Sequence, residues 1–171
     1  MEYKYIAVYC KMHNETQNSK ETIRNIFLKA KELFQRLDSS YADDDIKILL
    51  FGIKDPSIAY EYLPKEHIEA YDCKNIQDMS KKIWNIIRNN EFQSRIYIVL
   101  ANWQWKYIEP LLKLKHDNYK FFYEGALDPR PLDEINKEKE YEKSAKVKIK
   151  QGGLLGLLDT IGSNVSTDLK G

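Results

Sequence analysis

The sequence predicts a three-layer α/β sandwich with a mostly parallel central sheet. Three observations support this prediction. Short apolar runs alternate along the chain with longer segments in which apolar residues recur every three or four positions. The hydrophobic content of 43% over 171 residues is enough to build the core of one domain. Strands that alternate with helices favour a parallel sheet, because each crossover returns right-handedly over the sheet.

The N-terminal part of the chain predicts a buried strand followed by a long helix. Residues 3–10 are an apolar and aromatic run, and the polar stretch 13–19 after them is typical of a loop. From Ser19 to Leu37 the apolar positions recur in three- and four-residue steps, which places them on one side of an amphipathic helix. We expect Ser19 or Asn18 to be its N-cap.

The next apolar run predicts a strand in the middle of the sheet. Residues 46–53 are continuously apolar, apart from one lysine, which indicates burial on both faces, and Asp55 and Pro56 end the run. Residues 60–71 fit either a loop or a short edge strand, because Pro64 interrupts an imperfect alternation. We favour a loop excursion for this segment.

A second helix is predicted after that segment. Asn75 is placed to cap it, with Asp78 at its third position, and apolar residues from Ile76 to Ile87 form its buried side. Residues 89–90 are both asparagine and close the helix.

The order strand, helix, strand then continues. Residues 95–101 predict a third buried strand, and residues 103–113 predict a helix that is interrupted or restarted at Pro110. Residues 119–123 predict a fourth strand.

The C-terminal part has a different composition. Prolines precede Leu132, where a last helix can begin, and dense mixed charge follows. We therefore predict an α/β domain over residues 1–135, a charged helix or linker over 136–150, and an apolar docking segment with a flexible tail over 151–171.

The apolar segment near the C-terminus is too short to be stable as an isolated helix, so we expect it to dock. It can dock onto its own domain, into a groove of a partner, or onto another copy of the chain. A helix lying on a membrane surface is less well supported, since the apolar segment carries no lysines on its polar side. The residues expected to dock are Leu154, Leu155, Leu157, Leu158 and Ile161.

Charge and cysteine content exclude several classes of protein. The 27 basic and 26 acidic residues give a formal charge of +1, so no overall field attracts nucleic acid, and the lysines of 143–150 are more typical of a solvated linker. No apolar run approaches a membrane span, and we expect no signal peptide. Cys10 and Cys73 are too few for a disulfide framework or a zinc cage, so we expect packed, reduced thiols in a cytoplasmic protein.

Ligands of open α/β sheets bind at the carboxyl ends of the strands, so polar and aromatic residues after the predicted strands are the candidate site. We interpret this rim as an interaction surface. The two tryptophans at positions 103 and 105 fit interface anchors and core residues equally well. The predicted interaction rim consists of His13, Asn14, Glu15, Asp55, Asn102, Trp103 and Trp105.

The usual catalytic and cofactor motifs are missing from the sequence. Neither Gly-x-Gly-x-x-Gly nor a Walker A loop follows the first strand, and no Gly-x-Ser-x-Gly elbow occurs. The three histidines are scattered, so no pair has the spacing of zinc ligands. His13, Glu15 and Asp55 are as well explained by ordinary loop polarity as by a catalytic cluster. We therefore predict no cofactor, no catalytic residue and no metal ligand.

The order and spacing of these elements resemble the von Willebrand factor A domain. The resemblance lies in YIAVYCKMHNETQNS, IKILLFGI, AYDCKNIQDMSKKIWNII and IYIVLANWQW, and it is greatest to small bacterial forms associated with tellurite-resistance and stress gene clusters. It implies a Rossmann-like sandwich. It also implies a metal-ion-dependent adhesion site, in which an Asp-x-Ser-x-Ser run, a threonine and an aspartate hold Mg²⁺ for a partner's carboxylate.

This chain departs from that metal site at each position. The first motif falls on Cys10, Met12 and Asn14, the threonine loop falls on residues 73–77 without a threonine, and the last aspartate falls on Asn102. The resemblance therefore implies a degenerate member whose rim binds a protein without metal.

The main functional hypothesis is a non-enzymatic protein-binding module in a stress or defence context of a bacterium or its mobile elements, with another protein or another copy as partner. The alternative is a metal-dependent hydrolase or nuclease, in which Glu15, Asp55 and either Asp72 or Asp78 surround a divalent ion. A third hypothesis is a structural subunit whose tail exchanges between copies.

Overall fold

The computed structural model describes residues 3–40, 45–88, 94–112 and 119–143. The chain divides into two compact units, residues 1–131 and residues 132–171. The described strands belong to the first unit. In the second unit residues 132–143 are helical, which agrees with the helix expected to begin near Leu132 and, for residues 136–143, with one of the two predicted alternatives, a helix or a linker. Residues 144–150 and the tail 151–171, with its five expected docking residues, lie outside the described part.

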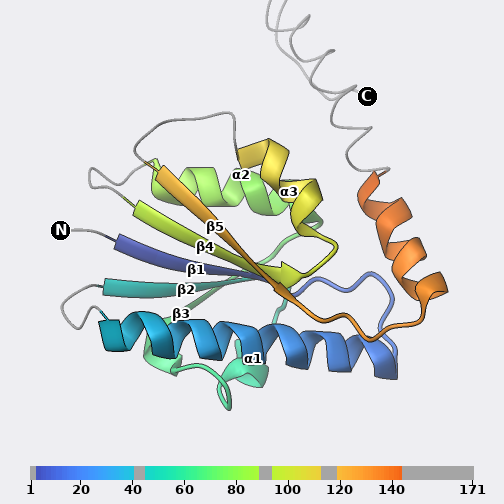
Figure 1. The fold of residues 1–171 in the computed structure, drawn as a ribbon, viewed down its shortest axis with the longest axis horizontal. Coiled ribbons are helices and arrows are strands. Elements are labelled where there is room, and N and C mark those ends of the chain that lie inside the picture. The colour runs from blue at the N-terminus through green and yellow to red at the C-terminus, as the bar shows by residue number, and fades with distance from the viewer. Residues whose placement is uncertain (1–2, 41–44, 89–93, 113–118, 144–171) are drawn as a thin grey trace, which may run out of the picture. The chain divides into compact units, whose positions relative to one another are not determined.

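The first unit is built on a parallel five-stranded sheet, which confirms the predicted α/β sandwich (Figure 1). The strand order is β3-β2-β1-β4-β5, and every neighbouring pair is parallel. The strands are β1 (Tyr3–Tyr9), β2 (Asp45–Phe51), β3 (Ile68–Tyr71), β4 (Ser94–Ala101) and β5 (Tyr119–Ala126).

The most apolar runs of the sequence occupy the middle of the sheet. β1 lies between β2 and β4, so Ile6 is in register with Ile48 on one side and with Tyr97 on the other. The side chains of Ile6 and Ile48 are fully buried. The continuous run 46–53 is therefore apolar because helices or loops cover both faces of β2, as predicted.

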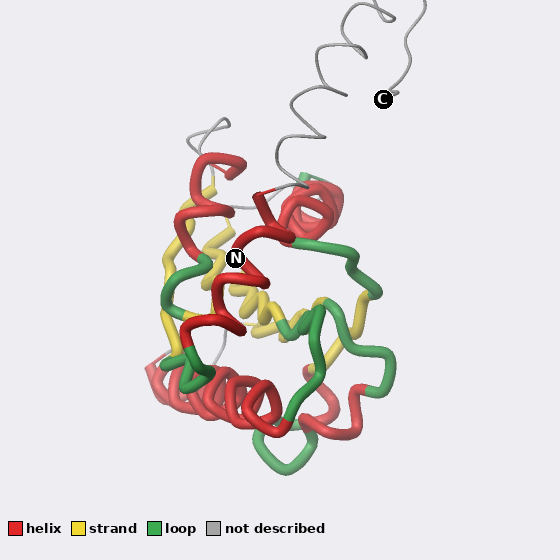
Figure 2. Tube along the Cα trace, turned by 90° about the vertical axis from the view of Figure 1, so that its right-hand side faces the viewer, coloured by secondary structure: helices red, strands yellow, loops and turns green. Residues whose placement is uncertain are grey.

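Helices cover both faces of the sheet, as Figures 1 and 2 show. Alternate residues of β1 face opposite layers: Ile6 and Val8 pack with α1, whereas Tyr5 and Ala7 pack with α2 and α3. The connection between β2 and β3 lies on the α1 side, since Ala59 belongs to that core. The helices are α1 (Gln17–Ser40), η1 (Pro56–Ala59), η2 (Lys65–His67), α2 (Ile76–Ile87) and α3 (Trp105–Leu112).

The start of α1 differs from the prediction that Ser19 or Asn18 is its cap. The Oγ1 of Thr16 accepts a hydrogen bond from the backbone N–H of Ser19 at 3.1 Å, and the Oγ of Ser19 accepts from the N–H of Thr16 at 2.8 Å. Thr16 is thus the N-cap and Ser19 the third helical residue of a reciprocal capping pair. The prediction of Ser19 or Asn18 was wrong because several polar residues near the start of the helix can act as caps. Only the structure shows which side chain reaches a free backbone N–H of the first turn.

The start of α2 agrees with the prediction. The side-chain oxygen of Asn75 accepts a hydrogen bond from the backbone N–H of Asp78 at 2.8 Å. This bond satisfies one of the amides that a helix leaves unpaired at its first turn.

The favoured loop over residues 60–71 is wrong in its last part. Residues 68–71 form β3, a short edge strand that pairs with β2, and the N–H of Gly52 extends the ladder by donating to the carbonyl of Tyr71 at 3.0 Å. The His67 ring contacts the carbonyl of Ile46 at 2.8 Å just before the strand begins. Residues 68–71 become a strand because they pair with β2. The residue pattern of the segment itself does not indicate this pairing.

The C-terminal half of the sheet is also longer than predicted. β5 continues beyond Tyr123 to Ala126, whose carbonyl accepts a hydrogen bond from the N–H of Asn102 at 2.8 Å. A Cβ at Gly125 would lie 2.9 Å from the Cα of Asn102, so glycine permits this close approach. α3 begins at Trp105 and contains Pro110 without a break.

Within the described part of the chain, no helix is long and apolar enough to cross a membrane.

Candidate functional site

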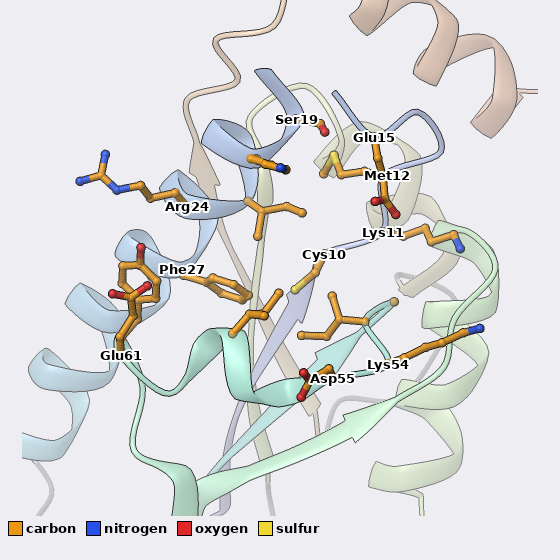
Figure 3. A pocket seen from close by; sticks show the side chains of 16 residues that line it. Cys10, Lys11, Met12, Glu15, Ser19, Arg24, Phe27, Lys54, Asp55 and Glu61 are labelled. Carbon is orange, nitrogen blue, oxygen red and sulfur yellow. The ribbon is translucent and has the colours of Figure 1, made fainter. Parts of the chain in front are cut away.

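A cavity of about 710 Å³ lies where the polypeptide leaves the carboxyl ends of β1 and β2 (Figure 3). The N-terminal half of α1 and the η1 segment close its other sides. This position agrees with the general location of ligand sites in open α/β sheets. Its apolar lining consists of Met12, Ile23, Phe27, Ile53, Ile58 and Tyr62.

The two strand-end loops begin in close contact and then separate. The N–H of Cys10 donates to the carbonyl of Phe51 at 2.8 Å, which continues the ladder by one bond. Gly52 follows with φ of 98°, and a Cβ there would lie 2.7 Å from the Cβ of Lys11. Beyond this contact one loop runs to α1 and the other runs to η1, so the cavity opens between them.

Cys10 lines the inner end of the cavity and is only 1% exposed. Burial, with a smaller contribution from Cys73, raises the pKa of the Cys10 thiol far above its ordinary value. Cys73 is equally buried, and its Sγ donates to the carbonyl of Asn75 at 3.1 Å. Both side chains lie in the cores, as expected for packed thiols.

Charged side chains of both signs surround the apolar lining. Figure 3 shows Lys11 and Lys54 extending to one side of the cavity, with Arg24 and Glu61 at the opposite side. The guanidinium of Arg24 lies 3.7 Å from a carboxylate oxygen of Glu21 on the exposed surface of α1. The charged residues of the lining are Lys11, Lys20, Arg24 and Lys54, with Glu15, Asp55 and Glu61.

Asp55 has a structural role in addition to its place in the lining. Its carboxylate accepts a hydrogen bond from the N–H of Ser57 at 3.1 Å and caps η1. Hydrogen bonding from Ser57 lowers the pKa of Asp55. The carboxylate therefore stays ionised and fixes the start of η1, which carries Ile58 into the cavity wall.

The predicted interaction rim is only partly assembled at this cavity. Glu15 and Asp55 line it, whereas the lining includes neither His13 nor Asn14 from the same loop. Asn102 is exposed after β4 and approaches β5.

The tryptophans, which the sequence left undecided, have different environments. Trp103 is 8% exposed and belongs to the interior, and Trp105 is 41% exposed at the start of α3. Neither residue lines the cavity.

Trp103 is held by a buried ion-pair network that the sequence pattern does not predict. The carboxylate of Asp128 accepts hydrogen bonds from Trp103 Nε1 at 2.9 Å and Thr22 Oγ1 at 2.7 Å. It also pairs with Arg130, whose Nη2 lies 2.7 Å away, and both charged side chains are 1% exposed. Burial alone would raise the pKa of Asp128, but the bonds from Arg130, Trp103 and Thr22 outweigh it and lower the pKa to about 2.

This network joins the chain after β5 to α1 and to the loop after β4. The only sequence signal for it is an aspartate and an arginine on either side of a proline, in a segment that we read as the approach to a helix. Other missed residues are Ile58 and Tyr62, whose apolar character between β2 and β3 was the available signal for the cavity wall.

The acidic cluster of the enzyme hypothesis is not assembled. Asp72 accepts from the N–H of Cys73 at 2.9 Å, and Asp78 accepts from the N–H of Lys74 at 2.9 Å. Neither carboxylate lines the cavity with Glu15 and Asp55. Across the described residues, no three His, Cys, Asp or Glu side chains come together as a group that could hold a metal ion.

Comparison with known proteins found no matching family, no similar curated protein and no similar solved structure.

Proposed function

We propose that this chain is a non-enzymatic protein-binding module, and that the cavity at the carboxyl ends of β1 and β2 receives a segment of a partner protein. The observation that carries this proposal is the combination of an apolar wall with basic and acidic side chains around it. Such a lining suits a peptide with one large apolar side chain and charged neighbours, because the apolar group is buried while the charges stay at the solvated rim.

The start of α1 supports a peptide over a nucleotide as ligand. Phosphate sites at helix starts use unpaired backbone amides, usually after a glycine-rich loop. Here the side chain of Thr16 already accepts from the N–H of Ser19, and the connection from β1 to α1 contains no glycine.

The two sides of the cavity favour different charges on the partner segment. Lys11 and Lys54 extend together on one side, so an acidic partner residue suits that side. Glu61 and Arg24 at the other side suit a residue with both donor and acceptor groups. This polarity gives the bound segment a preferred direction.

The biological setting is part of the proposal and depends on the sequence alone. The resemblance to small bacterial von Willebrand factor A domains favours a stress or defence role in the cytoplasm of a bacterium or its mobile elements. Because one α/β sandwich hosts many unrelated functions, the fold does not identify this family. Residues 151–171, with their apolar segment, are proposed as a second element that holds a partner.

Peptide selection against the full chain tests the cavity. A phage-displayed library of random peptides is selected on the wild-type protein, and the affinities of enriched peptides are measured by titration calorimetry. Ile58→Glu places a charge in the cavity wall at a residue that is 47% exposed. Leu28→Glu is the matched control, since Leu28 is 38% exposed on α1 and does not line the cavity.

We expect Ile58→Glu to weaken peptide binding at least about tenfold and Leu28→Glu to leave it unchanged. Equal affinities for wild type and Ile58→Glu, or a library without enrichment, contradict the proposed site.

Pull-down from the native host with and without residues 151–171 tests the second element, and identical partner profiles remove it from the proposal.

Thermal unfolding during titration with Mg²⁺ or Mn²⁺ separates this function from the metal-dependent hydrolase or nuclease. A ligand that binds only the folded state raises its melting temperature. We expect no shift with either ion, and a saturable increase favours the enzyme.

A further inference from the structure

The β5 strand forms one edge of the sheet over eight residues. Within the described part of the chain it pairs with β4 alone. After Ala126 the chain turns away toward α1, where Asn25 Nδ2 donates to the carbonyl of Leu127 at 3.0 Å. A long edge strand with aromatic residues is a template for adding another strand, and soluble proteins usually shorten, cover or charge such edges.

The backbone groups that point outward from β5 can be identified from its pairing. The carbonyl of Ala126 faces β4, because it accepts from the N–H of Asn102. Residues alternate along a strand, so Phe122 and Glu124 also direct their backbone groups to β4. Phe121 and Tyr123 direct theirs to the outer edge.

We propose that β5 pairs with β5 of a second copy of this chain, antiparallel and centred on Phe122, to form a two-fold symmetric dimer with a continuous sheet. In this register Phe121 exchanges both backbone hydrogen bonds with Tyr123 of the partner subunit. Phe122 lies opposite its own counterpart in a non-hydrogen-bonded position, where side chains approach most closely.

The charges of β5 are complementary to themselves in this arrangement. Lys120 and Glu124 lie at equal distances from Phe122, so each lysine faces Glu124 of the partner subunit on both sides of the two-fold axis. Glu124 already lies 3.7 Å from Arg36, whose positive charge adds to that of the incoming lysine. Moving the register by two residues loses at least one of these pairings, so the charges specify the alignment as well as the partner.

The aromatic residues of β5 extend the complementarity to both faces of the sheet. On the α1 face, Phe122 is 39% exposed and stacks on Tyr97 with centroids 4.9 Å apart. Its outer side is where the partner's ring would lie. On the opposite face, the ring centroids of Tyr123 and Trp105 are 6.4 Å apart. Trp105 is 41% exposed and Tyr123 is partly exposed, so the second strand would cover part of this aromatic pair.

This surface is separate from the cavity proposed to bind a peptide, since no residue of β5 lines that cavity. Failure of the proposed dimer would therefore leave the proposed peptide-binding cavity unaffected, and the reverse also holds.

Charge reversal with rescue tests the dimer in the full chain. Sedimentation velocity over about 1 to 100 µM is expected to show a reversible monomer–dimer equilibrium for the wild type. Lys120→Glu and Glu124→Lys each place like charges opposite one another and should raise the dimer dissociation constant at least about tenfold. An equimolar mixture of the two variants restores both opposite-charge pairs and should again dimerise, as should the double variant.

Amide hydrogen exchange by NMR gives the local readout. At dimer concentration the N–H groups of Phe121 and Tyr123 should exchange more slowly than in dilute protein, while those of Phe122 and Glu124 are already protected by β4. Three results would overturn the proposal: a wild type that is monomeric throughout, a dimer that either single reversal leaves unchanged, or single variants that stay monomeric when mixed. A dimer formed through residues 151–171 gives the second result.

Discussion

The indole N–H of Trp103 donates to the carboxylate of Asp128 at 2.9 Å, in the interior of the first unit. The two residues are separated by the whole of α3 and β5, so this bond closes the C-terminal strand connection onto the loop after β4. Thr22 on α1 and Arg130 complete the set of donors around the same carboxylate.

Asp128→Asn is expected to destabilise the protein by about 3 to 5 kcal/mol, because it leaves the buried guanidinium of Arg130 without its counter-charge. Urea unfolding followed by circular dichroism measures the change. Asp38→Asn, an exposed change on α1, is the control and should stay within about 0.5 kcal/mol of the wild type. A loss below about 1 kcal/mol for Asp128→Asn would show that the ion pair is not structurally required.

The same carboxylate predicts an acid-dependent stability. The folded pKa of Asp128 is about 2, below its ordinary value of 3.8, so the folded state binds this proton less readily than the unfolded state. The stabilisation of about 2 to 3 kcal/mol is therefore complete above about pH 5 and is lost as the pH falls toward 2. Urea midpoints across this range check it, and Asp128→Asn should show a flatter profile. Identical slopes for both proteins contradict the assignment to Asp128.

Thr16→Ala is expected to cost about 1 kcal/mol, since it removes the acceptor for the N–H of Ser19 at the first turn of α1. Asn18→Ala is the control, because the sequence also predicts Asn18 as a cap whereas the structure places it within α1. Its side chain is exposed, and we expect a change within about 0.5 kcal/mol. A larger loss of stability for Asn18→Ala than for Thr16→Ala would indicate that Asn18 is the cap.

Gly52→Ala should destabilise the protein by about 1 to 3 kcal/mol. The φ of 98° disfavours a side chain, and the new Cβ would meet the backbone of Lys11 at 2.8 to 2.9 Å. Gly52 and Lys11 lie in close contact where the two strand-end loops begin, and both residues line the cavity. Moving them apart should therefore also lower the affinity of the cavity for peptide. Lys54 lies in the same loop and is exposed, so Lys54→Ala is the control for stability. We expect it to change the free energy of unfolding by no more than about 0.5 kcal/mol.

The thiol of Cys10 is expected to be inert in the folded protein. Burial raises its pKa and blocks access, so little thiolate is present even at about pH 8. In a Cys73→Ala variant, a chromogenic disulfide reagent should label Cys10 only after urea is added. Rapid labelling without urea would mean that the cavity exposes the thiol.

Much of the fold followed from local pattern. The run 46–53 and the three- and four-residue spacing after Ser19 predicted a central strand and an amphipathic helix, because apolar periodicity reports which side of an element is buried. Asn75 and Asp78 predicted the start of α2 for a similarly local reason, since a cap and its partner are three residues apart. The position of the cavity also agrees with the sequence, as the carboxyl ends of parallel strands meet at one edge.

Other features depend on contacts between distant segments. Residues 68–71 are a strand because β2 supplies their hydrogen-bonding partner, and β5 reaches Ala126 because Asn102 and Gly125 approach closely. Trp103 and Trp105 are two residues apart in the same predicted segment, yet one is buried against Asp128 and the other is exposed.

Sequence alone determined the positions of β1, β2, β4, α1 and α2 and the parallel direction of the strands, since these properties arise from periodicity and from the handedness of crossovers. Only the tertiary structure decided which side chains line the cavity, which tryptophan is exposed, and that Thr22, Trp103 and Arg130 all donate to Asp128. Those outcomes depend on distances between residues far apart along the chain, and such distances are established only when the layers pack.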